Sequence, residues 1–328
     1  MKAAIFTKDD PPLQLNDVAL PKVGKGECLI RLKAAALNRR DYWITVGKYP
    51  GIKENVILGS DGCGIVEQGS EFWLGKEVVI NPNNNWGDNP DYQGEKYQIL
   101  GMPVNGTLAD YIVVNEDRLA PKPENLSYEE AAALPLAGLT AYRAVFTKAK
   151  VTEGQTVLIT GIGGGVSQFA LSFCLALGAK VYVTSSDKKK ISAAKSSGAK
   201  GGFNYKEAEW AKAALKEAKG FDVIIDSAGG SSLKDYMKLI KPGGKLVFYG
   251  STTGRPDDFD VFRLFWNQIS VLGSTMGNDQ EFVEMVKFIE EHKIKPVIDA
   301  VFDLDQVYEA FRRFISPDHR GKIIVKIN

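Results

Sequence analysis

The chain has 328 residues, of which 44% are hydrophobic and 25% charged, and its formal net charge is +1. This length exceeds what one hydrophobic core usually serves, so two domains are expected. The composition argues against a disordered or fibrous chain, and the near-neutral charge argues against a nucleic-acid partner or an anionic membrane surface. The amino-terminal apolar run is too short for a signal peptide, and the three cysteines have no C-x-x-C pair. These features predict a cytoplasmic protein without disulfides.

The first third of the chain is rich in short β-branched runs separated by Gly, Pro, Asn and Asp. The predicted strands are Lys2–Phe6, Glu27–Ala35, Ile57–Glu67, Glu77–Ile80 and Ala109–Val114. A proline-containing segment then marks a boundary, and Ser127 with Glu130 three residues later predicts a capping box at the start of a helix.

From about Ser127 onward, strands and helices alternate, which is typical of a parallel, doubly wound sheet. The predicted strands are Thr156–Thr160, Lys180–Thr184, Gly202–Asn204, Val223–Ser227, Lys245–Tyr249 and Ser270–Ser274. Helical patterns lie between them, for example over Glu207–Lys219 and Asp279–His292. Strand and loop return after Lys293 and end with a strand over Gly321–Lys326. The pattern predicts a nucleotide-binding domain, residues 125–293, inserted into a β-rich domain, residues 1–124 plus 294–328.

A glycine turn, Gly161-Ile-Gly-Gly-Gly-Val166, follows the strand that begins at Thr156. Glycines allow positive φ and a close approach of the backbone to phosphates, which bind the free N–H groups at a helix N-terminus. The turn departs from G-x-G-x-x-G because its closing position is Val166 or Ser167, depending on the register. The uncharged stretch Thr156–Ala179 is long enough to span a bilayer, but its glycines would break a spanning helix. We therefore interpret this stretch as strand, turn and helix, and predict a dinucleotide site.

Six further motifs stand in order around the glycine turn. They are Ala36-Leu-Asn-Arg-Arg-Asp41, Leu58-Gly-Ser-Asp-Gly-Cys-Gly-Ile-Val66, Gly106-Thr-Leu-Ala-Asp-Tyr111, Ala132-Ala-Leu-Pro-Leu-Ala-Gly-Leu-Thr-Ala-Tyr142, Asp222-Val-Ile-Ile-Asp-Ser-Ala-Gly229 and Pro242-Gly-Gly-Lys-Leu-Val247. With them the chain resembles, over essentially its full length, the medium-chain dehydrogenase/reductase superfamily and its zinc-free, quinone-oxidoreductase-like branch. The resemblance implies an α/β fold in which a Rossmann doubly wound parallel sheet is inserted into a β-rich, GroES-like catalytic domain. Ser167 departs from the glycine that usually closes the turn in this branch.

The resemblance also places Asn38, Ser60 and Asp61 where zinc-dependent alcohol dehydrogenases carry a Cys, a His and a Glu. The cysteine-free region Asn83–Gly101 stands where those enzymes have a four-cysteine structural lobe. Zinc needs three or four soft or imidazole ligands at short spacing. Cys63 and Cys174 lie in apolar segments and are interpreted as core thiols. The histidines, His292 and His319, lie far downstream, and His292 is interpreted as a helix C-cap. We therefore predict no metal site.

The end of the second strand of the nucleotide-binding domain selects the dinucleotide. NAD-selective folds place an acid there, on the ribose 2′-hydroxyl. Here the strand ends on Thr184-Ser-Ser186, and Asp187 is interpreted as the N-cap of the next helix. A carboxylate facing a 2′-phosphate would be a like-charge contact, so the hydroxyls and Lys190 favour NADP(H). The alternative interpretation makes Lys188–Lys190 a solvated first turn.

The resemblance assigns the other cofactor contacts residue by residue, with Asn38 facing the nicotinamide. The full predicted cofactor set is Asn38, Thr140, Gly163, Gly164, Gly165, Val166, Ser185, Ser186, Lys190, Tyr205, Ser227, Gly250 and Ser251.

Asn38 and Tyr42 are the predicted catalytic residues. Asn38 would be the polar group near the hydride-transfer centre, with a loop-capping amide as the alternative. Tyr42 would donate to the substrate oxygen, although the related tyrosine stands one place later, where this chain has Trp43. Asp41 is interpreted as a loop anchor, and Arg39 and Arg40 as solvated side chains that would favour an acidic substrate if one faced inward.

Without a Lewis acid to polarise an oxygen, alcohol oxidation loses its main electrostatic aid. Hydride transfer to an activated C=C bond or a quinone remains possible, because the negative charge moves to an oxygen remote from the hydride acceptor. The sequence therefore predicts an NADPH-dependent oxidoreductase acting on a small quinone or α,β-unsaturated carbonyl in the cleft between domains.

The alternatives are a zinc-type alcohol dehydrogenase, a methyltransferase, and a non-catalytic NADPH-binding protein of the lens-structural or RNA-binding kind. A methyltransferase normally carries an acid after the second strand, which is missing here. The resemblance further implies a homodimer or homotetramer, with Ser270–Ser274 as a candidate edge strand for pairing across a two-fold axis.

Overall fold

The computed structural model describes residues 1–256 and 258–328, which form two compact units. Unit 1 comprises Met1–Ala137 and Asn278–Asn328, and unit 2 comprises Gly138–Gly277. One unit is thus inserted into the other along the chain. Relative to the predicted domain limits, unit 1 also takes up helix α2 (Tyr128–Ala132), which contacts β3 (Glu27–Ala36) and β5 (Asp61–Gln68), and helix α9 (Asp279–Glu291).

Unit 2 is built on a six-stranded parallel sheet with the strand order β14-β13-β12-β15-β16-β17. The strands are β12 Thr156–Ile159, β13 Lys180–Ser185, β14 Gly201–Asn204, β15 Phe221–Asp226, β16 Ile240–Phe248 and β17 Ser270–Gly273. Reading outward from the first strand, the chain winds to β14 and then returns to wind to β17, which is the doubly wound Rossmann order. The predicted fold class is confirmed.

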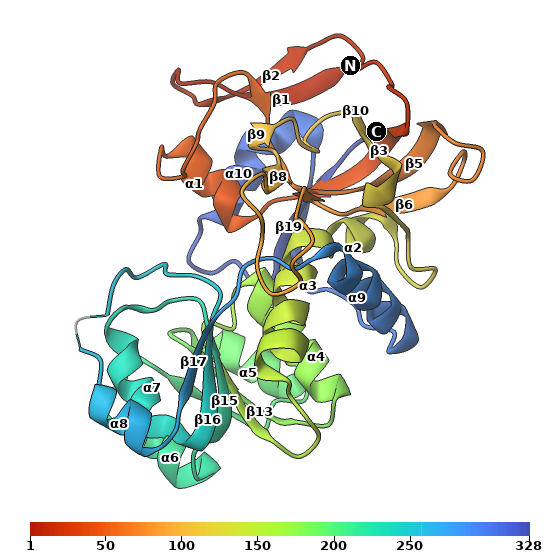
Figure 1. The fold of residues 1–328 in the computed structure, drawn as a ribbon. Helices are drawn as coiled ribbons and strands as arrows, with labels where there is room; N and C mark the ends of the chain where they lie inside the picture. Colours follow the sequence, from red (N-terminus) through yellow and green to blue (C-terminus); the bar gives the residue numbers. More distant parts are fainter. Residues whose placement is uncertain (257) are drawn as a thin grey trace. The chain divides into compact units, whose positions relative to one another are not determined.

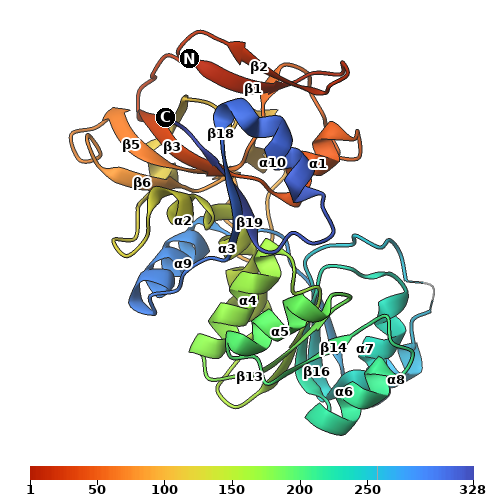
Figure 2. The same cartoon turned by 180° about the vertical axis from the view of Figure 1, so that it is seen from behind.

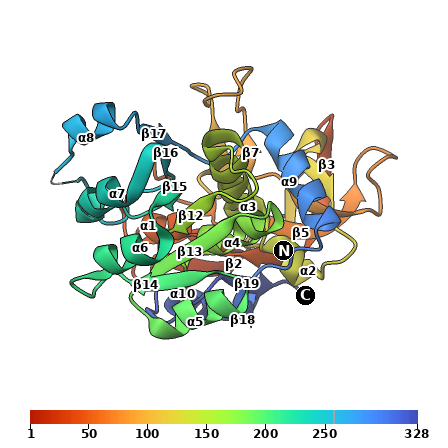
Figure 3. The ribbon, with the colours of Figure 1, turned by 90° about the horizontal axis from the view of Figure 1, so that it is seen from below.

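Helices cover the sheet of unit 2, with α4 and α5 along one side and α6 and α7 along the other (Figure 1, Figure 3). The helices of this unit are α4 Gly165–Ala176, α5 Lys188–Ser196, α6 Trp210–Ala218, α7 Leu233–Leu239 and α8 Val261–Trp266, preceded by α3 Pro135–Tyr142 and a π-helix over Arg143–Ala149; a 3-10 turn, Gly230–Ser232, precedes α7. The uncharged stretch Thr156–Ala179 is therefore a strand, a turn and a helix. Within the described ranges, no helix is long and apolar enough to cross a membrane.

Unit 1 is β-rich, and its largest sheet has seven strands. In this sheet β3 pairs with β5 (Figure 2) and with β10 (Tyr111–Asn115; Figure 1). The sheet continues through β6 Glu77–Ile80 and β11 Leu119–Pro121 on one side and β19 Lys322–Lys326 and β18 Ile298–Asp303 on the other. Two smaller sheets join β1 Lys2–Phe6, β2 Leu13–Asp17 and β4 Val56–Ile57, and β7 Asn83–Asn84, β8 Gln98–Leu100 and β9 Pro103–Val104. The remaining elements are α1 Arg39–Thr45, α10 Val307–Phe314 and 3-10 turns at Glu116–Arg118 and Leu304–Gln306.

The predicted strand over Ile57–Glu67 is interrupted, because the chain leaves β4 at Ile57 and enters β5 only at Asp61. Gly59 has φ +92°, and a Cβ there would lie 2.7 Å from Thr107 Oγ1, so only glycine fits this bend. The break sets Ser60 and Asp61 at the start of β5, opposite the end of β3, where Asp61 pairs with Ala36. This local departure positions two of the side chains of the candidate site.

Candidate active site

A network of buried charged and amide side chains lies in unit 1 where three strands of the main sheet meet. Strand β3 runs between β5 and β19, and the register places Asp61 and Ile324 on either side of Ala36. Leu37 N then donates to Ile323 O at 3.0 Å, so the chain just beyond β3 runs alongside the start of β19. This pairing brings Asn38 and Lys322 together across 284 residues of sequence.

Lys322 is the centre of this network and is 2% exposed. Its Nζ donates to Leu37 O at 2.8 Å, to Asn38 Oδ1 at 2.6 Å and to Asp61 Oδ2 at 2.8 Å. Asn38 Nδ2 also donates to Asp61 Oδ2, at 2.8 Å. The other carboxylate oxygen, Asp61 Oδ1, accepts from Leu136 N at 2.7 Å. The sequence motifs pointed to Asn38 and Asp61 but not to Lys322. The one sign of Lys322 in the sequence is that a lysine stands beside the apolar run of the last strand.

A second buried carboxyl, that of Asp41, lies beside this network at the start of α1. Asn38 N donates to Asp41 Oδ2 at 2.8 Å, so Asp41 anchors the turn into the helix as predicted. Asp41 is fully buried, and burial raises the pKa of its carboxyl to about 6, although Arg40 and the Asn38 N–H oppose that shift.

Arg40 is buried, which corrects the prediction that it is a solvated side chain. Its Nη1 donates to Ser60 Oγ and to Leu100 O, each at 2.7 Å, and its Nη2 donates to Met102 O at 2.9 Å. Ser60 Oγ in turn donates to Leu100 O at 2.8 Å. Arg40 thus ties α1 to the segment between β8 and β9, because a guanidinium can serve several acceptors at once. Arg39 is exposed, and its guanidinium lies 5.2 Å from the ring centre of Phe314.

The side chains that stand where zinc-dependent relatives carry a Cys, a His and a neighbouring Glu do not fit a zinc ion. Asn38 and Asp61 share the cationic ammonium of Lys322, and Ser60 is bonded to the cationic Arg40. Zinc requires soft thiolate or imidazole donors, or anionic oxygens free to face it. In the part of the chain that the structure describes, no three His, Cys, Asp or Glu side chains are grouped so that they could hold a metal.

The predicted cofactor residues of unit 2 gather at one edge of its sheet. They follow the carboxyl ends of the parallel strands, where ligands bind in open α/β sheets. The glycine turn follows β12, Ser185 ends β13 with Ser186 after it, Tyr205 follows β14, Ser227 follows β15, and Gly250 with Ser251 follows β16. Thr140, in α3, is buried and its Oγ1 lies 3.8 Å from Met276 Sδ. Asn38 belongs to unit 1, and its contact with a nicotinamide stays a prediction.

The glycine turn leads directly into the N-terminus of α4. Gly161 has φ +60°, Gly164 is the N-cap of α4, and Gly165 and Val166 begin that helix. Ser167, at the departing position of the motif, is buried, and its Oγ lies 2.8 Å from both Gly161 O and Gly164 O. The serine hydroxyl thus ties the glycine turn to the first turn of α4.

The helix cap that was predicted after β13 is present. Asp187 is the N-cap of α5, and its carboxylate accepts from Lys189 N at 2.7 Å. Ser185 Oγ accepts from Asp187 N at 3.1 Å. Lys190 reaches back from α5 to the glycine turn, since a Cβ added at Gly163 would lie 3.0 Å from Lys190 Nζ. The carboxylate of Asp187 is thus engaged in the cap, and an ammonium lies beside the turn.

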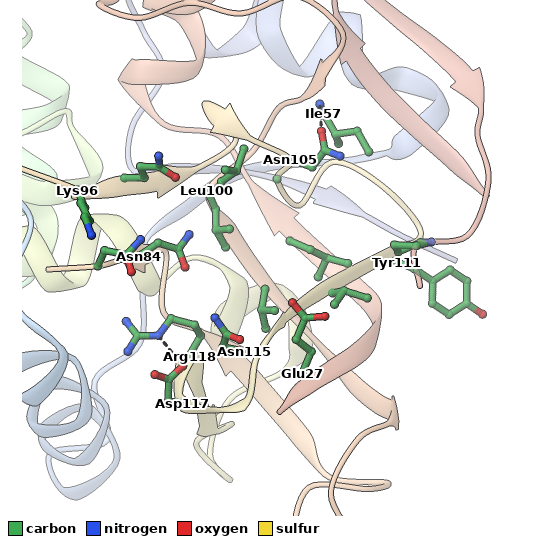
Figure 4. Close-up of a pocket in the computed structure, with 18 of the residues that line it drawn as sticks. Glu27, Ile57, Asn84, Lys96, Leu100, Asn105, Tyr111, Asn115, Asp117 and Arg118 are labelled. Atoms are coloured by element: carbon green, nitrogen blue, oxygen red, sulfur yellow. Dashed lines mark hydrogen bonds and ion pairs between the residues drawn. The ribbon is translucent and has the colours of Figure 1, made fainter. Parts of the chain in front are cut away.

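A cavity of about 1200 Å³ opens elsewhere in unit 1 (Figure 4). Its lining comes from the segment around Trp86, from the segment Gly94–Leu100 and from β10, and it includes Asn84, Lys96 and Arg118. Arg118 Nη1 also donates to Asp279 Oδ1 at 2.6 Å, which anchors α9 to this unit. The lining includes no member of the Lys322 network and no predicted site residue.

Comparison with known proteins agrees with this fold and these motifs. Residues 24–124 match the family model of the alcohol dehydrogenase GroES-like domain, and residues 165–291 match that of the zinc-binding dehydrogenase. The chain is 38% identical to the zinc-type alcohol dehydrogenase-like protein YogA of Leptosphaeria maculans, over 96% of this chain and 95% of that protein. It is 27% identical to a crotonyl-CoA reductase of Streptomyces avermitilis, over 98% of this chain and 84% of that protein. A crystal structure of an NAD-dependent alcohol dehydrogenase superposes with a TM-score of 0.93 at 35% identity, covering 100% of both chains.

A Rossmann sheet inserted into a GroES-like domain, with both parts matched in order, defines a class of nicotinamide-dependent oxidoreductases. The chain belongs to the medium-chain dehydrogenase/reductase superfamily. It is an oxidoreductase of that superfamily.

Proposed function

We propose that this oxidoreductase uses NADPH to reduce a quinone or the C=C bond of an α,β-unsaturated carbonyl, and that it does so without zinc. The observation that carries the proposal is the Lys322 ammonium bonded to Asn38 Oδ1 and Asp61 Oδ2. A cation that is part of the protein is bonded to two residues, Asn38 and Asp61, that stand where a zinc-dependent relative would carry a Cys and a Glu. A site of this kind has hydrogen bonds and fixed charges to offer, but no open coordination position for an alcohol oxygen.

The chemistry suits such a site. When bound, NADPH would supply the hydride for the β-carbon of the enone, and the negative charge would develop on the carbonyl oxygen as the conjugated double bonds shift to an enolate. A proton from solvent or a nearby hydroxyl then completes the saturated carbonyl product. In this proposal Asn38 donates a hydrogen bond to the oxygen on which the negative charge develops, and Tyr42 is a second donor. Tyr42 is half-buried and its ring lies 5.3 Å from that of Trp43.

Unit 2 would hold the cofactor at the carboxyl edge of its sheet. The pyrophosphate would bind the N–H groups of Gly163 to Val166 at the start of α4. Thr140, Ser227, Gly250 and Ser251 are proposed to line the rest of the site, with Tyr205, an exposed side chain, beside the adenine ribose. The engagement of Asp187 in the α5 cap and the presence of Lys190 beside the turn support NADPH over NADH, because neither feature sets an anion against a 2′-phosphate.

The proposal is tested by measuring NADPH oxidation with a panel of quinones, enones, alkenals and acryloyl thioesters, and by repeating the panel with NADH. Turnover of at least one acceptor class with NADPH is expected. Lys190→Glu should raise the KM for NADPH much more than the KM for NADH. Equal changes would make Lys190 a surface charge and would remove the support for NADPH.

A second candidate function is alcohol oxidation with zinc, which is favoured by the names of the relatives. It predicts stoichiometric zinc in the purified protein and alcohol turnover that chelators abolish. The proposed function predicts substoichiometric zinc and enone reduction that chelators do not change. NADPH binding without turnover of any acceptor would instead support a non-catalytic role.

We further propose that the protein is a homodimer, or a tetramer of such dimers, paired through β17. This strand is the last in the sheet order of unit 2 and pairs with β16 on its inner side. Beside it in the chain, α8 exposes a group of apolar side chains, Val261, Phe262, Phe265 and Trp266. A second copy would supply both a partner for the free strand edge and cover for these aromatic rings.

A further inference from the structure

Within the described part of the chain, the Lys322 network leaves one side-chain N–H bond without an acceptor. Lys322 Nζ has three N–H bonds and three acceptors, Leu37 O, Asn38 Oδ1 and Asp61 Oδ2. Asn38 Nδ2 has two N–H bonds, and one of them goes to Asp61 Oδ2. Among residues 1–256 and 258–328 no second acceptor contacts Nδ2. The network therefore ends on one available N–H bond, and that bond belongs to Asn38.

The same network determines which end of the Asn38 amide carries that bond. An amide oxygen and an amide nitrogen have nearly the same shape, so hydrogen-bond partners decide the orientation of the group. Here Oδ1 accepts from the Lys322 ammonium at 2.6 Å while Nδ2 donates to the Asp61 carboxylate at 2.8 Å. A rotation by half a turn would set N–H bonds against the ammonium and the amide oxygen against the carboxylate. Both contacts would be repulsive, so the rotated amide is excluded.

Lys322 binds both Asn38 and Asp61, the other side-chain partner of Asn38. Its ammonium bridges Asn38 Oδ1 and Asp61 Oδ2, so the amide and the carboxylate cannot move independently. Its third bond, to Leu37 O, fixes the ammonium to the backbone immediately before Asn38. The lysine is nearly fully buried, and the strand that carries it is paired with β3 on one side and β18 on the other. These contacts leave the side chain little freedom.

We infer that Lys322 is a positioning residue for hydride transfer: it orients the Asn38 amide so that Nδ2 rather than Oδ1 is presented to the substrate oxygen. This inference rests on the proposed function, in which Asn38 donates to the oxygen that gains negative charge. A donor that is already fixed stabilises that charge without reorganising during the reaction. An amide free to rotate would present its oxygen part of the time and would repel the same charge.

The inference is tested with two variants and one matched control. Lys322→Met removes the ammonium but leaves the Asp61 carboxylate buried without it. Lys322→Met combined with Asp61→Asn leaves no unpaired charge, and it places beside Asn38 a second amide that can donate or accept, so the orientation of Asn38 is lost. Lys326→Met is the control, because Lys326 is an exposed lysine on the same strand.

The readout is the split between kcat and KM, with kcat expressed per NADPH-binding site so that unfolded protein does not count. Both Lys322 variants should lose about ten- to a hundredfold in kcat for an enone, because a fixed donor to a developing oxyanion contributes about that much or more. The KM for NADPH should stay within about twofold, because the proposed phosphate and ribose contacts lie in unit 2. The control should match the wild type. A wild-type kcat in the paired variant would overturn the inference.

Failure of this inference and failure of the proposed function give different results. If the wild-type protein turns over no enone or quinone, the proposed function fails and this inference fails with it. If Asn38→Ala abolishes turnover while the Lys322 variants keep the wild-type kcat per site, Asn38 acts as proposed and the positioning role of Lys322 is wrong.

Discussion

Lys322 Nζ and Asp61 Oδ2 lie 2.8 Å apart although 261 residues separate them in the sequence. Both side chains are almost completely withdrawn from solvent, at 2% and 0% exposure. Two ions in such surroundings stabilise a fold only weakly as a pair, because their desolvation offsets most of their attraction. Removing one of the two ions is costly, because the other is left as a buried charge without a partner. A change in protein stability is therefore expected that is separate from any effect on catalysis.

Lys322→Met should lower the free energy of unfolding by about 3–5 kcal/mol, because it leaves a buried carboxylate without its cation. Adding Asp61→Asn should recover a large part of that loss, since the paired variant buries no charge at this position. Urea unfolding of the wild type, both single variants and the paired variant measures the coupling. Strictly additive losses would mean that the two side chains do not act as a pair.

Asp41 should make stability depend on pH in a direction opposite to that of most carboxylates. Its pKa is raised by burial to about 6 in the folded chain, against 3.8 for the ordinary group, in surroundings that include Arg40, Asp61 and Lys322. The folded state therefore holds this proton more tightly than the unfolded state. The corresponding stabilisation is complete below about pH 4 and is lost as pH rises through about 6, a change on the order of 2–3 kcal/mol.

The measurement for Asp41 is the difference in unfolding free energy between the wild type and Asp41→Asn, taken from pH 4 to pH 7. The free energy of unfolding of the wild type should fall relative to that of the variant as the pH rises through this range. Asp10→Asn, at an exposed carboxylate, is the control for the removal of one carboxyl group. A difference that stays constant with pH would show that Asp41 titrates near its ordinary value.

Ser167→Ala should loosen the glycine turn. The change removes a hydroxyl that lies 2.8 Å from Gly161 O and Gly164 O, which should lower stability by about 1 kcal/mol. If the turn holds the pyrophosphate, the Kd for NADPH should rise as well. Ser172→Ala is a matched control on the same helix, because the Ser172 hydroxyl bonds to Gln168 O at 3.2 Å and not to the turn. Equal effects of the two changes on the Kd would remove Ser167 from the cofactor site.

Val271→Lys should dissociate the proposed dimer. Val271 lies on β17 with its side chain 40% exposed, and a lysine at a strand edge opposes pairing with another strand. The sedimentation coefficient should fall from that of an assembly to that of a monomer, and the secondary structure should remain intact. Phe262→Ser, on the exposed face of α8, should weaken the same assembly if the second copy also covers that helix. An unchanged sedimentation coefficient in Val271→Lys would rule out pairing through β17.

The repetitive parts of the fold could be predicted because their signals are local. Strand β1 and the capping box at Ser127 lie where the sequence predicted them, and Asp187 caps α5 as expected. The strands and helices of unit 2 follow from apolar periodicity and from turn residues, and their order follows from the handedness of parallel crossovers. The short strands around residues 83–104 were not predicted, because two-residue pairings leave no pattern in a sequence.

The candidate site could be predicted only in part, since its members meet through tertiary pairing. Asn38, Ser60 and Asp61 were found through their place in motifs, but the partner that binds two of them, Lys322, lies at the far end of the chain. A lysine in a five-residue strand resembles any strand-end charge until the register of β19 on β3 is known. Arg40 was misjudged for the same reason, because its acceptors are backbone carbonyls of a distant loop.

We propose above all that this oxidoreductase reduces a conjugated acceptor with NADPH and without zinc. The most direct measurement is the oxidation of NADPH, followed by its absorbance, with an enone or quinone as acceptor in protein freed of metal by chelation. We expect turnover that chelation leaves unchanged and that Asn38→Ala strongly reduces. Turnover of alcohols that requires added zinc, with no reduction of any enone or quinone, would contradict it.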